Sequence, residues 1–156
     1  MSFVRHVFVG IVAGAAGTAA LNIATYGDMV LRGRGESDVP STMVKNLAEA
    51  AGVGALASDD DSTAHRRSAL GALLGYANGL GVGAAYGAIR PALRGIPVLL
   101  AAVAAGGAAM VLSDLPIAKS GASDPSTWSA ADWAADAIPH LAYGLALALS
   151  FDALRD

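Results

Sequence analysis

Residues 71–87, "GALLGYANGLGVGAAYG", determine how this chain packs. Glycine recurs in them at every fourth position, at Gly71, Gly75, Gly79, Gly83 and Gly87. Because a helix has 3.6 residues per turn, this spacing puts the five glycines on one slanted stripe. Small residues let two helices approach to backbone contact, which is how helices pack tightly in a membrane. The stretch therefore predicts a helix in close contact with a neighbour.

A second stretch offers a matching face. In "VFVGIVAGAAGTAALNIATY", residues 7–26, the same four-residue spacing is kept at Gly10, Gly14, Thr18, Asn22 and Tyr26. We expect this face to dock on the glycine stripe of residues 71–87, either within one chain or across a dimer interface.

The composition points to a membrane. Of the 156 residues, 54% are hydrophobic and only 15% are charged, whereas soluble domains average about 25% charged residues. The net charge of −3 and the lack of a basic tract give no reason to expect nucleic acid as a partner. The absence of cysteine excludes disulfides, thiolate metal sites and cysteine nucleophiles.

Four windows approach the roughly 20 apolar residues that a membrane-spanning helix needs. They are residues 7–26, 69–89, 96–115 and 130–151. The sequence therefore predicts an all-α, polytopic membrane protein, with residues 1–156 forming one domain built as a four-transmembrane-helix bundle. The first window also resembles a secretory signal peptide, although its apolar stretch is long for one.

The long polar loop, residues 27–68, is expected to contain a short interfacial helix. Ser41 or Thr42 would cap this helix, and the residues expected on its apolar side are Met43, Val44, Leu47 and Ala51. The segment that follows, "SDDDSTAHRRS" at residues 58–68, is typical of a solvated connector.

The head of the last window, "WSAADWAADAIPHLAYG" at residues 128–144, is unusually polar. Asp132 fits the third position of a helix capped by Ser129, and the two tryptophans fit the aromatic belt of a membrane boundary. Asp136, His140 and Tyr143 share a helix face with Asp132 and lie deeper. Charged groups at that depth face a bundle interior or a wet cavity, so we take these residues, with Asp114, as a candidate polar or proton site.

Three interpretations of Asp136 and His140 remain open: a structural pair, a proton-handling or ligand-binding site, and a metal site. A metal site would need further ligands, for which Asp114, Asp28 and His65 are candidates without diagnostic spacing. No cofactor is predicted, although a bound lipid or metal ion would fit this segment. Ser113 could be combined with His140 and Asp114 into a serine–histidine–aspartate set, but no motif supports it.

The runs "GIVAGAAGTAALNIATYGDMVLRGR" at residues 10–34 and "DWAADAIPHLAYG" at 132–144, together with the glycine-rich window, carry a resemblance. The chain resembles a group of small, Ala- and Gly-rich, four-span inner-membrane proteins of high-GC bacteria such as actinobacteria. It is more loosely similar to the YagU-like proteins, which carry a histidine near the start of their last span. The resemblance implies a four-span architecture in the bacterial inner membrane and supplies no catalytic residues.

Three functions follow as hypotheses. The first is a non-enzymatic accessory or scaffold protein that packs through its glycine-rich faces, as a homo-oligomer or a subunit of a larger membrane complex. The second is a small proton- or cation-linked transporter or channel component that uses Asp136 and His140. The third is a membrane enzyme or lipid-binding protein that uses the Asp/His/Tyr face. In each case the lipid bilayer is the expected surrounding.

Overall fold

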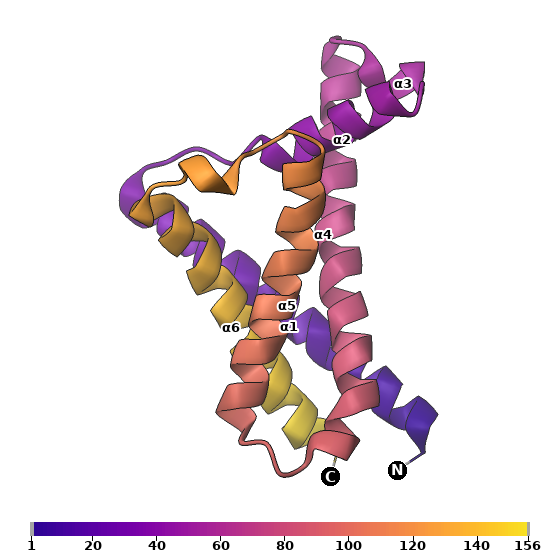
Figure 1. The fold of residues 1–156 in the computed structure, drawn as a ribbon, viewed down its shortest axis with the longest axis vertical. Helices are drawn as coiled ribbons and strands as arrows, with labels where there is room; N and C mark the ends of the chain where they lie inside the picture. Colours follow the sequence, from indigo (N-terminus) through magenta and orange to yellow (C-terminus); the bar gives the residue numbers. More distant parts are fainter. Residues whose placement is uncertain (1, 156) are drawn as a thin grey trace.

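The computed structural model describes residues 2–155, which are helical throughout apart from short connections and contain no strand (Figure 1). The four long helices are α1 (Phe3–Arg32), α4 (Asp61–Ile89), α5 (Val98–Lys119) and α6 (Ala130–Arg155). The short elements are α2 (Val39–Ala50), α3 (Gly54–Ala57), η1 (Arg90–Leu93) and η2 (Pro125–Thr127). The prediction of an all-α protein is confirmed.

The long helices pack in the order α4–α1–α6–α5, with extensive contact between each successive pair and a thinner seam between α5 and α4. In Figure 1, α1 and α6 run obliquely past α4 and α5, and both termini lie at the lower end of the molecule. The linker between α1 and α2 and the loop between α5 and α6 lie at the opposite end. There α2 and α3 pack around the first turns of α4.

Three helices, α1, α5 and α6, are long and apolar enough to cross a membrane by length and composition. Helix α4 contains the predicted second span, residues 69–89, but is not among the three. Its glycines and its polar first turns lower its hydrophobicity. The structure therefore supports three candidate spans and leaves the four-span arrangement as a hypothesis.

Helices α1 and α4 touch backbone to backbone at their crossing. A Cβ added at Gly83 would lie 2.7 Å from the Cα of Gly14 and would also meet the carbonyl oxygen of Gly10. A Cβ at Gly87 would lie 3.0 Å from the Cα of Gly10. Gly79 faces Thr18 of α1, whereas Gly75 has no neighbouring atom within 4 Å.

The other stripe glycine near a neighbour, Gly71, faces α2: a Cβ there would lie 2.9 Å from the Cβ of Pro40. Helices α5 and α6 also cross through glycine, since a Cβ at Gly144 would lie 2.7 Å from the backbone nitrogen of Gly106. Both crossings thus depend on missing side chains.

The core lies at the α1–α6 contact. Tyr143, Leu147 and Phe151 of α6 are its largest fully buried side chains. The ring of Tyr143 occupies the space that a side chain at Gly17 would need, with a closest approach of 2.8 Å. Phe151 packs edge-on against Tyr86 of α4, with ring centroids 5.3 Å apart. This core closes the bundle toward the end that holds both termini.

The short helix predicted in the long loop is present as α2, but it begins earlier. Its N-cap is Asp38 rather than Ser41 or Thr42, and Pro40 lies in its first turn, where the missing N–H costs nothing. Its buried residues are Met43, Val44 and Ala48. Leu47, expected on the same side, is exposed, because the buried side of α2 faces α4.

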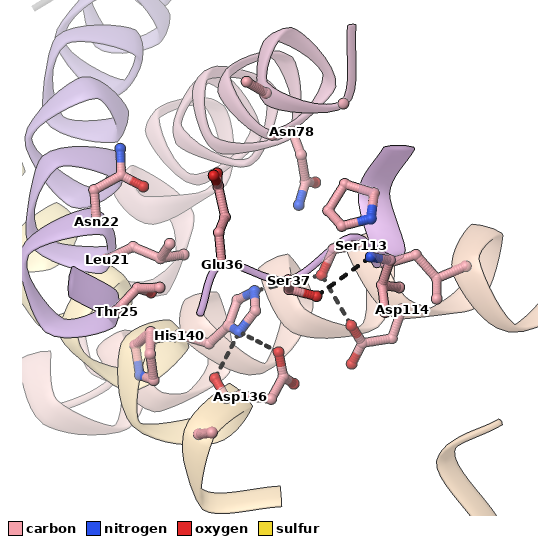
Figure 2. Close-up of a pocket in the computed structure, with 18 of the residues that line it drawn as sticks. Leu21, Asn22, Thr25, Glu36, Ser37, Asn78, Ser113, Asp114, Asp136 and His140 are labelled. Carbon is pink, nitrogen blue, oxygen red and sulfur yellow. Dashed lines mark hydrogen bonds and ion pairs between the residues drawn. The ribbon is translucent and has the colours of Figure 1, made fainter. Parts of the chain in front are cut away.

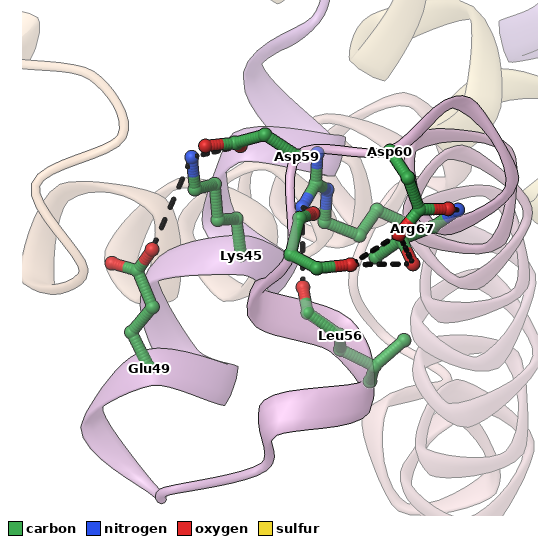
Figure 3. A network of polar contacts seen from close by, with 8 residues as sticks. Lys45, Glu49, Leu56, Asp59, Asp60 and Arg67 are labelled. Carbon is green, nitrogen blue, oxygen red and sulfur yellow. Dashed lines mark hydrogen bonds and ion pairs between the residues drawn. The ribbon is translucent and has the colours of Figure 1, made fainter.

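The predicted solvated connector, residues 58–68, is mostly the first two turns of α4. The helix begins early because the Asp60 carboxylate caps it, accepting hydrogen bonds from the Thr63 backbone N–H (2.9 Å) and hydroxyl (2.9 Å). Arg67 is buried one turn later and donates to the carbonyls of Leu56 (3.2 Å) and Ser58 (2.7 Å), as Figure 3 shows. These bonds tie α3 to α4.

Candidate functional site

The four long helices line an open pocket of about 900 Å³ near the α1–α2 linker and the loop before α6. The pocket follows from the glycine crossing of α1 and α4. Because the crossing lies in the first half of α1 and the second half of α4, the other halves of the two helices diverge. The α1–α2 linker, through Glu36 and Ser37, and the loop before α6, through Trp128, complete the pocket wall.

His140 is the central side chain of the pocket (Figure 2). Its Nδ1 lies 2.8 Å from the backbone carbonyl oxygen of Asp136 and 3.4 Å from the carboxylate Oδ1 of the same residue. A carbonyl only accepts hydrogen bonds, so this contact places a proton on Nδ1. Its Nε2 then faces the hydroxyl of Ser113 at 3.4 Å.

Asp136 and His140 are separated by one helix turn on α6. The fold brings Ser113 and Asp114 of α5 beside this pair (Figure 2). One carboxylate oxygen of Asp136, Oδ2, is buried and has no hydrogen-bond partner among residues 2–155. A buried acceptor of this kind is costly unless a proton, water or ligand satisfies it.

The pocket wall carries more negative than positive charge. Two guanidinium groups, of Arg32 and Arg34, face five carboxylates, which belong to Glu36, Asp38, Asp114, Asp132 and Asp136. Both guanidinium groups are already paired with one carboxylate, Asp28, at 2.7 and 2.6 Å. The deep part of the pocket therefore offers an environment that favours a cation.

Asp132 lies at the rim and serves as a helix cap. Its carboxylate accepts hydrogen bonds from the backbone N–H (2.9 Å) and hydroxyl (2.7 Å) of Ser129, and its own N–H donates to that hydroxyl. This reciprocal pattern is a capping box. Trp128 and Trp133 stack edge-on beside it, with ring centroids 4.9 Å apart.

Tyr143 forms the floor of the pocket and is almost fully buried. Its hydroxyl donates to the backbone carbonyl of Gly79 at 2.6 Å, which joins α6 to α4. This bond satisfies the hydroxyl, so Tyr143 is placed as a packing residue between the pocket and the core.

The residues considered for a metal site do not assemble. His65 is exposed on α4 and is not among the residues that line the pocket, and Asp28 is engaged by the two arginines. Within residues 2–155, no three His, Cys, Asp or Glu side chains are close enough together to hold a metal ion.

Two further polar side chains contribute to the pocket. A polar residue deep in an apolar window, such as Asn78, is expected to bond to another helix. Asn78 of α4 does so, donating to the carbonyl of Ala109 on α5 at 2.9 Å across the thin seam between these helices. Glu36 was not predicted from the sequence, because it comes from a linker whose position no periodic pattern predicts.

The order Ser113–His140–Asp136 resembles a nucleophile, base and orienting acid. Its surroundings do not favour acyl transfer. The Ser113 hydroxyl donates to the carbonyl of Met110 at 2.8 Å. The nearby Asn78 amide already donates to the carbonyl of Ala109. Asp114 beside Ser113 would also repel a developing oxyanion.

No protein-family model matches the sequence, and no curated protein or solved structure is significantly similar to it. Any function assigned to the chain therefore rests on the geometry of the pocket.

Proposed function

We propose that this chain is a four-span protein of the bacterial inner membrane whose pocket binds a cation in exchange for a proton. It would act as a small transporter or as a component of one. The observation that carries the proposal is the unpartnered Asp136 carboxylate oxygen in an acidic pocket between helices with apolar outer faces.

The outer faces of all four long helices support a bilayer as the surrounding. Each of them exposes large apolar side chains, among them Phe8, Ile23, Leu73, Leu99, Val111 and Leu145. Helix α4 has 29 residues, which is about 44 Å at 1.5 Å per residue, and it packs along α1. If α1, α5 and α6 span the bilayer, α4 is long enough and apolar enough outside to span it beside them.

The exchange would work through charge. When Asp136 is ionised, its free oxygen attracts a cation, and when it is protonated, that attraction is lost. The ionisable groups that share the pocket with it are His140, Asp132 and Tyr143 on α6, Asp114 on α5, Tyr76 on α4, Glu36 and Asp38 near the linker, and Tyr26, Arg32 and Arg34 on or after α1. Asp114 and His140 are the closest of these and would tune the exchange.

The other functional hypotheses have less support. A lipid phosphate would need the guanidinium groups of Arg32 and Arg34, which Asp28 already neutralises in part. An acyl-transfer enzyme would need a reactive serine, which the surroundings of Ser113 oppose.

The test is a proton flux in liposomes that contain the protein and a pH-sensitive dye. Adding Na⁺, K⁺ or a permeant organic cation outside should drive protons out, and Asp136→Asn should abolish this signal. Asp61→Asn, at an exposed carboxylate on α4 outside the pocket, is the matched control and should keep it. A signal of equal size in Asp136→Asn and the control, or no signal with any cation, would refute the proposal.

A scaffold role is the second candidate, and one observation favours it. Gly81 and Gly107 are exposed, do not line the pocket and have no neighbouring atoms within 4 Å, so they remain free for a second chain. The stripe glycines Gly71, Gly79, Gly83 and Gly87 are used inside the chain. Cross-linking in native membranes tests this role: Gly81→Leu should reduce a cross-linked oligomer, and an unchanged oligomer would count against glycine-driven assembly.

A further inference from the structure

We infer that the cation bound in the pocket is a lipophilic organic cation, such as an amphipathic amine, rather than an inorganic ion. This inference rests on the proposed function and names its ligand class. Three features of the pocket carry it: its size, the lack of a cluster of metal ligands in residues 2–155 and the apolar and aromatic part of its wall.

The size of the pocket suits an organic molecule. Sites for drug-sized ligands measure roughly 300–1,000 Å³, and this pocket measures about 900 Å³. An inorganic cation of the calcium type gathers roughly six to eight oxygens around it, and no cluster of three ligating side chains is present in residues 2–155. A pocket this large with so few convergent ligands leaves an inorganic ion mostly unsatisfied.

The carboxylates of the pocket can bind one positively charged group. The free oxygen of Asp136 on α6 and the carboxylate of Asp114 on α5 line the pocket from two helices (Figure 2). An ammonium group needs one to three such acceptors, and a quaternary centre needs only the negative potential. His140 lies beside Asp136, with its Nδ1 3.4 Å from the Asp136 Oδ1 and its Nε2 turned toward Ser113.

Apolar and aromatic side chains form much of the remaining wall, together with uncharged polar side chains such as Thr18, Asn22 and Thr25. Leu21 and Met29 of α1 and Ile117 of α5 line the pocket, and Tyr76 and Trp128 add aromatic rings. Apolar walls stabilise a hydrocarbon tail by excluding water, and aromatic faces attract cations. A ligand that combines a positive head with an apolar body would satisfy both parts of the pocket.

Direct binding to the full chain in lipid nanodiscs tests the inference with a pair of ions that match in size and shape. Tetraphenylphosphonium is the lipophilic cation and tetraphenylborate the lipophilic anion. Trp128 lines the pocket and Trp133 does not, so Trp128 fluorescence in a Trp133→Phe background reports occupancy, and empty nanodiscs give the partitioning background. We expect saturable binding of the cation only, weakened about tenfold or more by Asp136→Asn and unchanged by Asp61→Asn.

Asp114→Asn provides a second variant if Asp136→Asn fails to fold, and it should weaken cation binding in the same direction. Equal binding of the two tetraphenyl ions, or cation binding that neither pocket variant alters, would overturn the inference. If Na⁺ or K⁺ drives an Asp136-dependent proton flux but tetraphenylphosphonium does not bind, the ligand class is wrong and the proposed function survives. If no cation drives a flux, the proposed function itself fails.

Discussion

The two ends of the bundle use the same helices in opposite ways. At the end with the termini, α1 and α4 touch through Gly10, Gly14 and Gly83, and α6 fills the remaining space with Leu147 and Phe151. At the other end the helices part around a pocket that holds Asp114, Asp136 and His140. The closest backbone contacts and the largest buried side chains lie at the first end, and the acidic pocket lies at the second.

This difference shows how a small helical protein can hold a polar pocket open. Backbone contact at one end fixes the crossing of α1 and α4, and Tyr143 seals the boundary between the two ends by bonding to Gly79. The pocket end then needs few packing contacts of its own. The predictions that follow test this division of roles, from the largest expected effect to the smallest.

The largest effect is expected for Gly83→Leu at the crossing. The new side chain would collide with the backbone of Gly10 and Gly14, which cannot move aside as a flexible side chain would. We expect the free energy of unfolding to fall by about 3 kcal/mol, measured by denaturation in detergent with circular dichroism. Gly75→Leu makes the same change on the same helix in open space and should shift it by less than about 0.5 kcal/mol. Equal losses in both variants would contradict the assignment of the crossing.

Tyr143→Phe should have the next largest effect. The substitution keeps the ring but leaves the buried carbonyl of Gly79 without its partner. We expect a loss of about 1 kcal/mol in the same unfolding measurement. Tyr76→Phe is the control, because Tyr76 is half exposed. A larger loss at Tyr76 would place the seal between the two ends elsewhere.

Asp60 should make the start of α4 sensitive to acid. Hydrogen bonds from Ser58, Ser62 and Thr63 hold the pKa of the Asp60 carboxyl well below its ordinary value of 3.8. A lowered pKa means that the ionised cap stabilises the helix above about pH 4 and that this stabilisation is lost as the pH falls further. Hydrogen exchange of the amides at residues 61–67, referred to the intrinsic rate at each pH, should rise on acidification.

The matched variant for this effect is Asp60→Asn, which can still cap the helix but carries no charge. Its exchange should be nearly independent of pH between 5 and 2. If the acid sensitivity persists in this variant, it arises from another group, and Asp59, whose pKa is lowered by its bond to Lys45, would be the next to test.

The smallest effect on stability is expected for Asp136→Asn. Its Oδ2 atom is buried without a partner, so removing the charge takes away little that the fold uses. We expect the free energy of unfolding to change by less than about 0.5 kcal/mol or to rise slightly. Strong destabilisation would mean that the carboxylate is structural, as the first interpretation of the Asp136–His140 pair holds.

The sequence predicted the parts of the fold that depend on local pattern. The glycine spacing in 71–87 and in 7–26 is regular, and these faces do meet at Gly10, Gly14 and Gly83. The capping of α6 by Ser129 and Asp132 was equally local. The start of α4 was missed because the acidic run at residues 58–61 looked solvated, although one of its members, Asp60, is a cap.

The pocket could be predicted only in part. Asp136 and His140 share a helix, so their spacing placed them together, whereas Ser113 and Asp114 reach them through the packing of α5 on α6. Tyr143 shows the same limit of prediction from spacing. Its spacing placed it on the polar face, but its partner is the carbonyl of Gly79, 64 positions away, and no periodicity reports such a contact.

The contact between α1 and α6 has a consequence for biogenesis. The ring of Tyr143 fills the notch at Gly17, and Phe151 stacks on His6, with ring centroids 6.4 Å apart. Helix α1 is translated before α6, so one of its faces stays uncovered until α6 has been made. A nascent chain arrested before residue 130 would leave that face without the helix that covers it.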